Sequence, residues 1–88
     1  MKTSNIVMVD RSGSHKTGTL YNVSKRHIVD VLGEANVDDD PSKVRYSWGF
    51  EVDGVFCAIW DWKGSGDQMI WSTFGPQDVI QSLFNQGE

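Results

Sequence analysis

Side chains capable of covalent chemistry are few and far apart in this sequence. Cys57 is the single cysteine, and the two histidines, His15 and His27, have no serine, cysteine or aspartate at a spacing typical of a triad. Cys57 falls in the middle of a predicted strand with Phe50 opposite, which favours a small buried core residue over a nucleophile. We therefore predict no catalytic residue and a protein that is not an enzyme.

Two short segments have the composition of an ion or phosphate site but not its pattern. Asp38-Asp39-Asp40 places three carboxylates in a row, whereas a calcium loop alternates its ligands. Gly64-Ser65-Gly66 lacks the Gly-Lys-Ser/Thr ending of a phosphate loop. One cysteine also excludes a cysteine-based zinc site. We predict no metal and no cofactor, and we interpret residues 38–40 as a solvated acidic loop or a contact for a basic protein.

A hairpin over residues 43–63 is the clearest structural signal. Apolar and polar residues alternate up to Val52, and Asp53-Gly54 follows, the dipeptide favoured in a two-residue type I′ turn. If Val52 pairs with Val55, every later pair follows by the two-residue period. The pairs expected on one face are Phe50 with Cys57, Trp48 with Ile59 and Tyr46 with Asp61. Those expected on the other face are Glu51 with Phe56, Gly49 with Ala58, Ser47 with Trp60 and Arg45 with Trp62.

The remaining elements follow from shorter signals. Apolar runs predict strands at 6–9, 17–21 and 69–74, and helical spacing predicts helices after Ser24 and Pro76. Ser24 is the expected N-cap of the first helix, and Gly33 its expected left-handed C-terminal residue. We predict one α+β domain over residues 1–88, an antiparallel sheet of four to five strands packed with two short helices in the order β-β-α-β-β-β-α. Helices on the Trp48 and Phe50 face would leave the opposite face open.

Composition narrows the class of partner. The 88 residues include 8 Lys and Arg against 12 Asp and Glu, a formal net charge of -4. General binding to nucleic acid needs a basic excess, so we do not expect it. No segment is long and apolar enough to predict a membrane span, and the first residues lack an apolar export signal, which favours the cytosol.

The predicted open face is the first candidate binding site. Trp60 would lie over Ser47, and Trp62 would stack against Arg45 with Lys63 nearby. Tryptophan and arginine dominate many binding interfaces. The alternative is that a helix or the N-terminal strands cover this face, so that its tryptophans belong to the core as Trp48 does.

The entrance to the first helix is the second candidate. Lys25 and Arg26 occupy its first turn, where the helix dipole disfavours positive charge. An anion bound by Ser24, the free backbone amides and these side chains would reverse that cost. The alternative is a solvated basic turn that pairs with Asp10 or Glu34.

Several motifs resemble a family of small proteins from tailed bacteriophages. They are Gly18-Thr19, the segment 32–36, the Trp-containing hairpin 48–54 with Asp-Gly, Asp61-Trp62-Lys63 and a later Trp71. Ala35 departs from the proline usual in that family. The resemblance implies an accessory protein in the cytoplasm of a bacterial host, and it implies no chemistry.

Three functions remain open. The first is a non-enzymatic protein that inhibits a host defence component through Trp60, Trp62 or the acidic loop. The second is an oligomer that sequesters a small nucleotide signal, with Trp62 stacking on a base and Lys25, Arg26 and Lys63 meeting phosphates. The third is a virion or replication accessory protein whose aromatic residues serve self-assembly.

Overall fold

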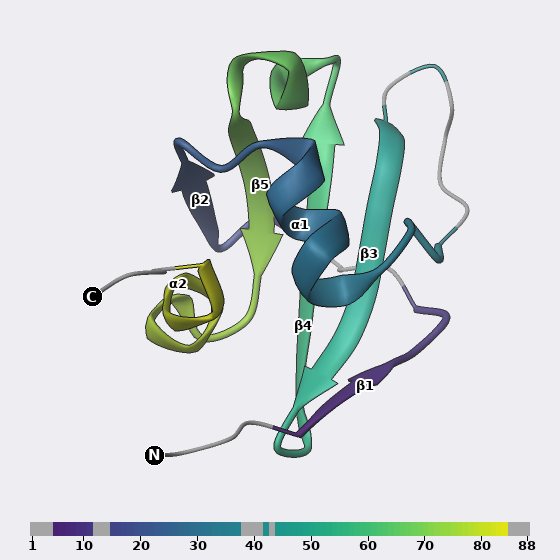
Figure 1. The fold of residues 1–88 in the computed structure, drawn as a ribbon, viewed down its shortest axis with the longest axis vertical. Helices are drawn as coiled ribbons and strands as arrows, with labels where there is room; N and C mark the ends of the chain where they lie inside the picture. The colour runs from purple at the N-terminus through teal and green to yellow at the C-terminus, as the bar shows by residue number, and fades with distance from the viewer. Residues whose placement is uncertain (1–4, 12–14, 38–41, 43, 85–88) are drawn as a thin grey trace.

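The chain folds into one antiparallel sheet with two helices packed against it, as the computed structural model shows (Figure 1). The structure describes residues 5–11, 15–37, 42 and 44–84, so the predicted acidic loop at 38–40 lies outside it. Within these residues the elements are β1 (Ile6–Met8), β2 (Gly18–Tyr21), α1 (Lys25–Leu32), β3 (Val44–Val52), β4 (Val55–Trp62), the 3-10 helix η1 (Ser65–Gln68), β5 (Ile70–Phe74) and α2 (Gln77–Phe84). The predicted α+β class and the order of strands and α-helices are confirmed.

The strand order is β1-β3-β4-β5-β2, and both helices cover the same face of the sheet. In Figure 1, α1 lies across the front of the sheet and α2 lies beside the end of β5. The core between these layers contains Trp48 and Cys57, both fully buried as predicted. The other buried apolar members of this core are Leu20, Val23, Ile28, Leu32, Phe50, Val52, Ile59, Trp71, Ile80 and Phe84.

The ends of α1 follow the predicted signals with one difference. The hydroxyl of Ser24 accepts a hydrogen bond from the backbone N–H of His27 at 3.1 Å, so Ser24 is the N-cap. Gly33 has a positive φ of 91°, which favours glycine, but its ψ of -169° is extended and not left-handed helical. The carbonyl of Gly33 accepts a hydrogen bond from Nε1 of Trp48 at 2.8 Å, an interaction that ties the helix end to β3.

The β3–β4 register agrees with the prediction from Val52↔Val55 as far as Ser47↔Trp60, and then it shifts. Val44, not Arg45, is paired with Trp62, because two residues of β3 stand opposite one residue of β4. The predicted pairing of Tyr46 with Asp61 is therefore replaced by a β-bulge, and the predicted pairing of Arg45 with Trp62 is wrong.

The face opposite the helices is only partly open, which corrects the prediction of a free face. Residues 9–11 lie against this face, since a Cβ at Gly49 would overlap the backbone carbonyl of Arg11 and approach that of Val9. The guanidinium carbon of Arg11 lies 4.2 Å from the centre of the Phe56 ring. The ring of His15 packs edge-on against Phe74 at 5.3 Å. These described residues of the N-terminal segment therefore cover the face around Gly49, Phe56 and Phe74.

The Gly64-Ser65-Gly66 connection forms the start of the ordered 3-10 helix η1 and is not merely a flexible link. The hydroxyl of Ser65 accepts a hydrogen bond from the backbone N–H of Trp62 at 3.2 Å. Gly66 is buried, and a Cβ there would meet the ring of Trp71 at 2.6 Å. This close approach fixes the path of the chain from β4 to β5.

Neither helix spans a bilayer. Both α1 and α2 are eight residues long, and no helix in the described residues combines the length and hydropathy that a membrane crossing needs.

Candidate binding surface

Exposed aromatic side chains gather at the end of the sheet where β2 and β4 end and β5 begins. Tyr21 is the last residue of β2 and pairs with Ile70, the first residue of β5. Trp60 pairs with Ser72, so Trp62, two residues further along β4, projects from the same face as Trp60 and beside Ile70. We call this surface the aromatic end, and its members are Tyr21, Trp60, Trp62, Met69 and Ile70.

The aromatic end holds most of the exposed large apolar surface of the described chain. Tyr21 is 64% exposed, Trp62 45% and Met69 43%. The two other large apolar residues with comparable exposure, Val7 and Val55, lie elsewhere, in β1 and beside the β3–β4 turn. Single exposed apolar residues are ordinary, whereas a group at one end of a small sheet is characteristic of a contact surface.

Backbone strain coincides with the same end of the sheet. Asn22, Lys63 and Met69 have positive φ angles of 60°, 52° and 60°. Asn22 directly follows Tyr21, and Lys63 directly follows Trp62. Left-handed backbone is uncommon for lysine and methionine, and such strain concentrates at functional sites. The turns that present these side chains are thus held in a costly conformation by the rest of the fold.

Basic side chains lie over the rings of Trp62 and Tyr46. The Nζ atom of Lys63 lies 5.6 Å from the centre of the Trp62 ring. Lys25, in the first turn of α1, places its Nζ atom 4.1 Å from the centre of the Tyr46 ring, and the guanidinium carbon of Arg45 lies 5.3 Å from the same ring. Residues distant in sequence therefore meet at Tyr46 through cation–π contacts.

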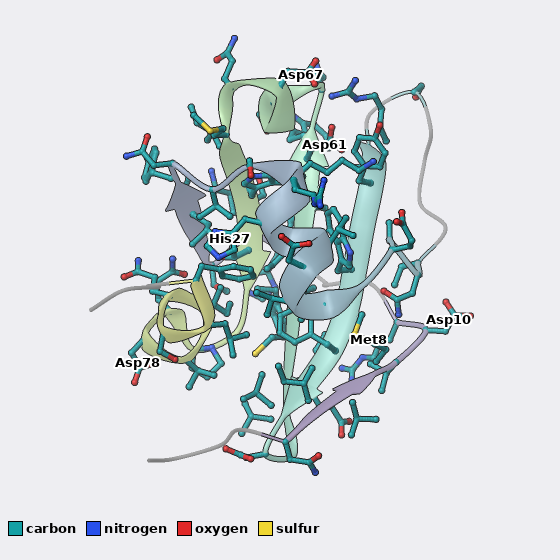
Figure 2. All side chains as sticks on the ribbon, viewed as in Figure 1. Met8, Asp10, His27, Asp61, Asp67 and Asp78 are labelled. Atoms are coloured by element: carbon teal, nitrogen blue, oxygen red, sulfur yellow. The ribbon has the colours of Figure 1, made fainter. Side chains whose placement is uncertain are left out.

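Arg45 is held by two carboxylates. Its Nε atom donates to Oδ2 of Asp61 at 3.0 Å, and its Nη2 atom donates to Oδ1 of Asp67 at 2.8 Å. Figure 2 shows Asp61 and Asp67 at the same end of the sheet. The hydrogen bonds with Asp67 and Asp61 raise the pKa of Arg45 above its usual value, so the guanidinium is charged wherever the protein is folded.

The six predicted site residues do not form one site. Trp60, Trp62 and Lys63 lie together at the aromatic end, and Lys25 joins Arg45 at Tyr46. Arg26 pairs with Asp30 at 3.2 Å, one turn further along α1, and not with the predicted Asp10 or Glu34. The predicted anion site at the helix entrance is therefore divided, because Lys25 turns to an aromatic ring and Arg26 to a carboxylate.

Tyr21 and Met69 belong to the surface but were not predicted as site residues. The β2–β5 pairing brings Tyr21 beside Ile70, and no local pattern in the sequence specifies that two strands 48 residues apart are neighbours. Met69 was assigned to the strand itself, whereas it precedes β5 in a left-handed turn. In the sequence, the Gly64-Ser65-Gly66 segment shortly before Met69 indicates a turn at this place.

No group of three or more His, Cys, Asp or Glu side chains in the described part of the chain is arranged to hold a metal ion. The histidine rings have aromatic neighbours, Phe74 for His15 and Phe84 for His27. Comparisons of this chain with protein-family models, curated proteins and solved structures found no match in any of the three.

Proposed function

We propose that this chain is a non-enzymatic binding domain and that its partner contacts the aromatic end. The exposure of Tyr21, Trp62 and Met69 on one edge of the sheet carries this proposal. A domain of 88 residues has few large apolar side chains for its core, and exposing three of them together sacrifices burial. A partner that covers them restores that burial.

The composition of the surface favours a protein as the partner. Protein interfaces have a core enriched in tryptophan, tyrosine and methionine and a rim of polar and charged residues. Here the charged group of Lys63 lies 5.6 Å from the centre of the exposed Trp62 ring, and Arg45 pairs with the exposed Asp67. The resemblance to tailed-phage proteins supports a more specific proposal, in which the partner is a component of bacterial host defence and the domain inhibits it in the host cytoplasm.

The experiment compares two variants in an affinity pull-down from bacterial host cells. Trp62→Ala removes the largest exposed ring of the aromatic end, and Val55→Ala removes a side chain of similar exposure, 44%, beside the β3–β4 turn. We expect wild type and Val55→Ala to retain the same host protein and Trp62→Ala to lose it. Retention of that protein by all three chains would show that the partner does not contact the aromatic end. A phage-protection assay with the same three chains tests the defence role, and Trp62→Ala should lose the protection that wild type and Val55→Ala give.

Sequestration of a nucleotide signal is a less favoured proposal for the same chain. Its predicted phosphate ligands, Lys25, Arg26 and Lys63, contact a tyrosine ring, a carboxylate and a tryptophan ring respectively. Within one chain they do not converge on one base. In an oligomer, these residues could meet one nucleotide from several subunits. Calorimetry against cyclic dinucleotides and trinucleotides tests this alternative.

The third proposal is a virion or replication accessory protein that assembles with itself. Light scattering at high protein concentration tests this self-assembly.

A further inference from the structure

The sheet has two edge strands, β2 and β1, and they differ in what covers them. At β2, Nε2 of Gln77 donates to the backbone carbonyl of Thr19 at 2.9 Å, so a side chain of α2 occupies this edge. Gly18 allows this approach, since a Cβ there would overlap the Gln77 carboxamide. Beyond the end of β1, the backbone N–H of Asn36 donates to the Ser47 carbonyl of β3 at 3.2 Å and covers the edge there. The edge of β1 itself is open.

The backbone groups of Ile6 and Met8 point away from the sheet. The carbonyl of Asn5 accepts from the β3–β4 turn at 2.9 Å, and the N–H of Val9 donates to a carbonyl of β3 at 3.0 Å, so both residues face β3. Because this direction alternates along a strand, Val7 also faces β3, and Ile6 and Met8 face outward. No hydrogen bond within the described residues engages the backbone of Ile6 or Met8.

β1 also lacks the features by which proteins usually protect an edge strand. The segment Ile6-Val7-Met8-Val9 contains no charged residue and no proline, and its pairing with β3 is regular. The side chain of Val7 is 47% exposed, whereas Ile6 and Met8 pack against the core. In Figure 1, β1 lies at the outer margin of the molecule. An uncharged edge of this kind is a template on which another strand can pair.

A second copy of β1 fits this edge in an antiparallel register. With a two-fold axis at Val7, Ile6 of each copy stands opposite Met8 of the other, and each such pair exchanges both backbone hydrogen bonds. Val7 stands opposite Val7 of the second copy in a non-hydrogen-bonded pair, in which side chains lie closest. The strand is therefore complementary to itself. A charge in this strand would meet a like charge in its own copy, and β1 has none.

We propose that two copies of this chain associate through β1 into a symmetric dimer with one continuous sheet. The contact is short, so we expect a dissociation constant on the order of 0.1–1 mM, typical of a small transient interface. This interface is separate from the aromatic end, because β1 pairs with β3 at Phe50–Val52, whereas Trp62 pairs with Val44 at the other end of β3. The proposal thus goes beyond the protein-binding function above, and the dimer presents two aromatic ends.

Translational diffusion measured by NMR from ~20 μM to ~2 mM tests the dimer across its expected dissociation constant. Wild type should change from monomer to dimer over this range. Val7→Lys places like charges opposite each other at the axis, so it should weaken association about tenfold. Val55→Lys is the matched control, because Val55 is 44% exposed and lies beside the β3–β4 turn, and it should dimerise as wild type. Both variants change the net charge equally, and circular dichroism checks that both keep the fold.

A mixture of Val7→Lys and Val7→Glu tests the position of the two-fold axis. Opposite charges meet across the axis in the mixed dimer, so the mixture should associate about tenfold more tightly than either variant alone. In wild type, the backbone N–H groups of Ile6 and Met8 should exchange more slowly with solvent as the protein concentration rises. Trp62→Ala should dimerise as wild type, so a failure of this dimer and a failure of the pull-down are distinguishable.

Three results would each overturn this proposal. The first is a monomeric wild type at ~2 mM, which would leave the edge of β1 to a strand of another protein. The second is equal association of wild type and Val7→Lys, or its loss in Trp62→Ala, either of which would place self-association on another surface. The third is a mixture of the Lys and Glu variants that associates no more tightly than each variant alone.

Discussion

Asp61 and Arg45 are joined by two hydrogen bonds at the β-bulge of β3. Oδ1 of Asp61 accepts from the backbone N–H of Arg45 at 2.9 Å, and Oδ2 accepts from Nε of the same residue at 3.0 Å. Oδ1 also accepts from the backbone N–H of Tyr46 at 2.9 Å. The carboxylate is fully buried, so it replaces the strand partners that the bulge removes from the sheet.

Replacing Asp61 with alanine should lower the free energy of unfolding by roughly 2–4 kcal/mol, because two backbone N–H groups lose their acceptor. Chemical denaturation measures this change. Asp67→Asn is the control, since Asp67 is 72% exposed and its bond to Arg45 is screened by water. A loss as large for Asp67→Asn as for Asp61→Ala would mean that the ion pairs, and not the bulge amides, hold this end of the hairpin.

Trp71 and Trp62 should differ sharply in their effect on stability. Trp71 is fully buried and its indole N–H donates to the Val23 carbonyl, whereas Trp62 is 45% exposed. Trp71→Phe should therefore cost roughly 2–4 kcal/mol through a lost hydrogen bond and a cavity, and Trp62→Phe about 0.5 kcal/mol or less. Thermal unfolding of both variants checks this, and equal costs would show that Trp62 is a core residue.

Gly49 should tolerate no larger residue. A Cβ at this position would overlap the carbonyl of Arg11 and approach that of Val9 to 2.7 Å, and both are backbone atoms that cannot rotate away. Gly49→Ala should destabilise the fold by about 1–3 kcal/mol and displace the segment that crosses the sheet. Hydrogen exchange at the Val9 amide, which donates to the Gly49 carbonyl at 3.0 Å, should accelerate. Unchanged protection at Val9 would contradict this account.

Local patterns were sufficient to predict the fold because each element has its own signal. Alternation and the Asp53-Gly54 turn specify the hairpin, and Ser24 caps α1 as its type predicts. The bulge at Arg45 escaped prediction because its cause is a buried carboxylate on another strand, and a strict two-residue period cannot include an extra residue. One bulge was enough to replace the predicted Arg45–Trp62 pair with the pair Val44–Trp62.

The candidate surface was harder to predict because it depends on which strands are neighbours. Trp60 and Trp62 share a face by period alone, but Tyr21 reaches them only through the β2–β5 pairing. The path of the N-terminal segment across the sheet likewise depends on Gly49, whose missing side chain leaves no positive signal in the sequence. Non-local pairing of this kind is set by the whole core and not by any one segment.

Cys57 should make the stability of the fold fall at alkaline pH. Burial raises the pKa of its thiol from 9.0 to about 11, so the unfolded chain loses this proton at a lower pH than the folded one. The thiol therefore contributes full stability below about pH 9, and this contribution is lost as the pH rises towards 11. Between about pH 8 and about pH 10, the free energy of unfolding of wild type should fall by about 1 kcal/mol more than that of Cys57→Ala. Parallel pH profiles of the two proteins would show that Cys57 reaches solvent in the folded state, and rapid reaction of the native thiol with a disulfide reagent would confirm that result.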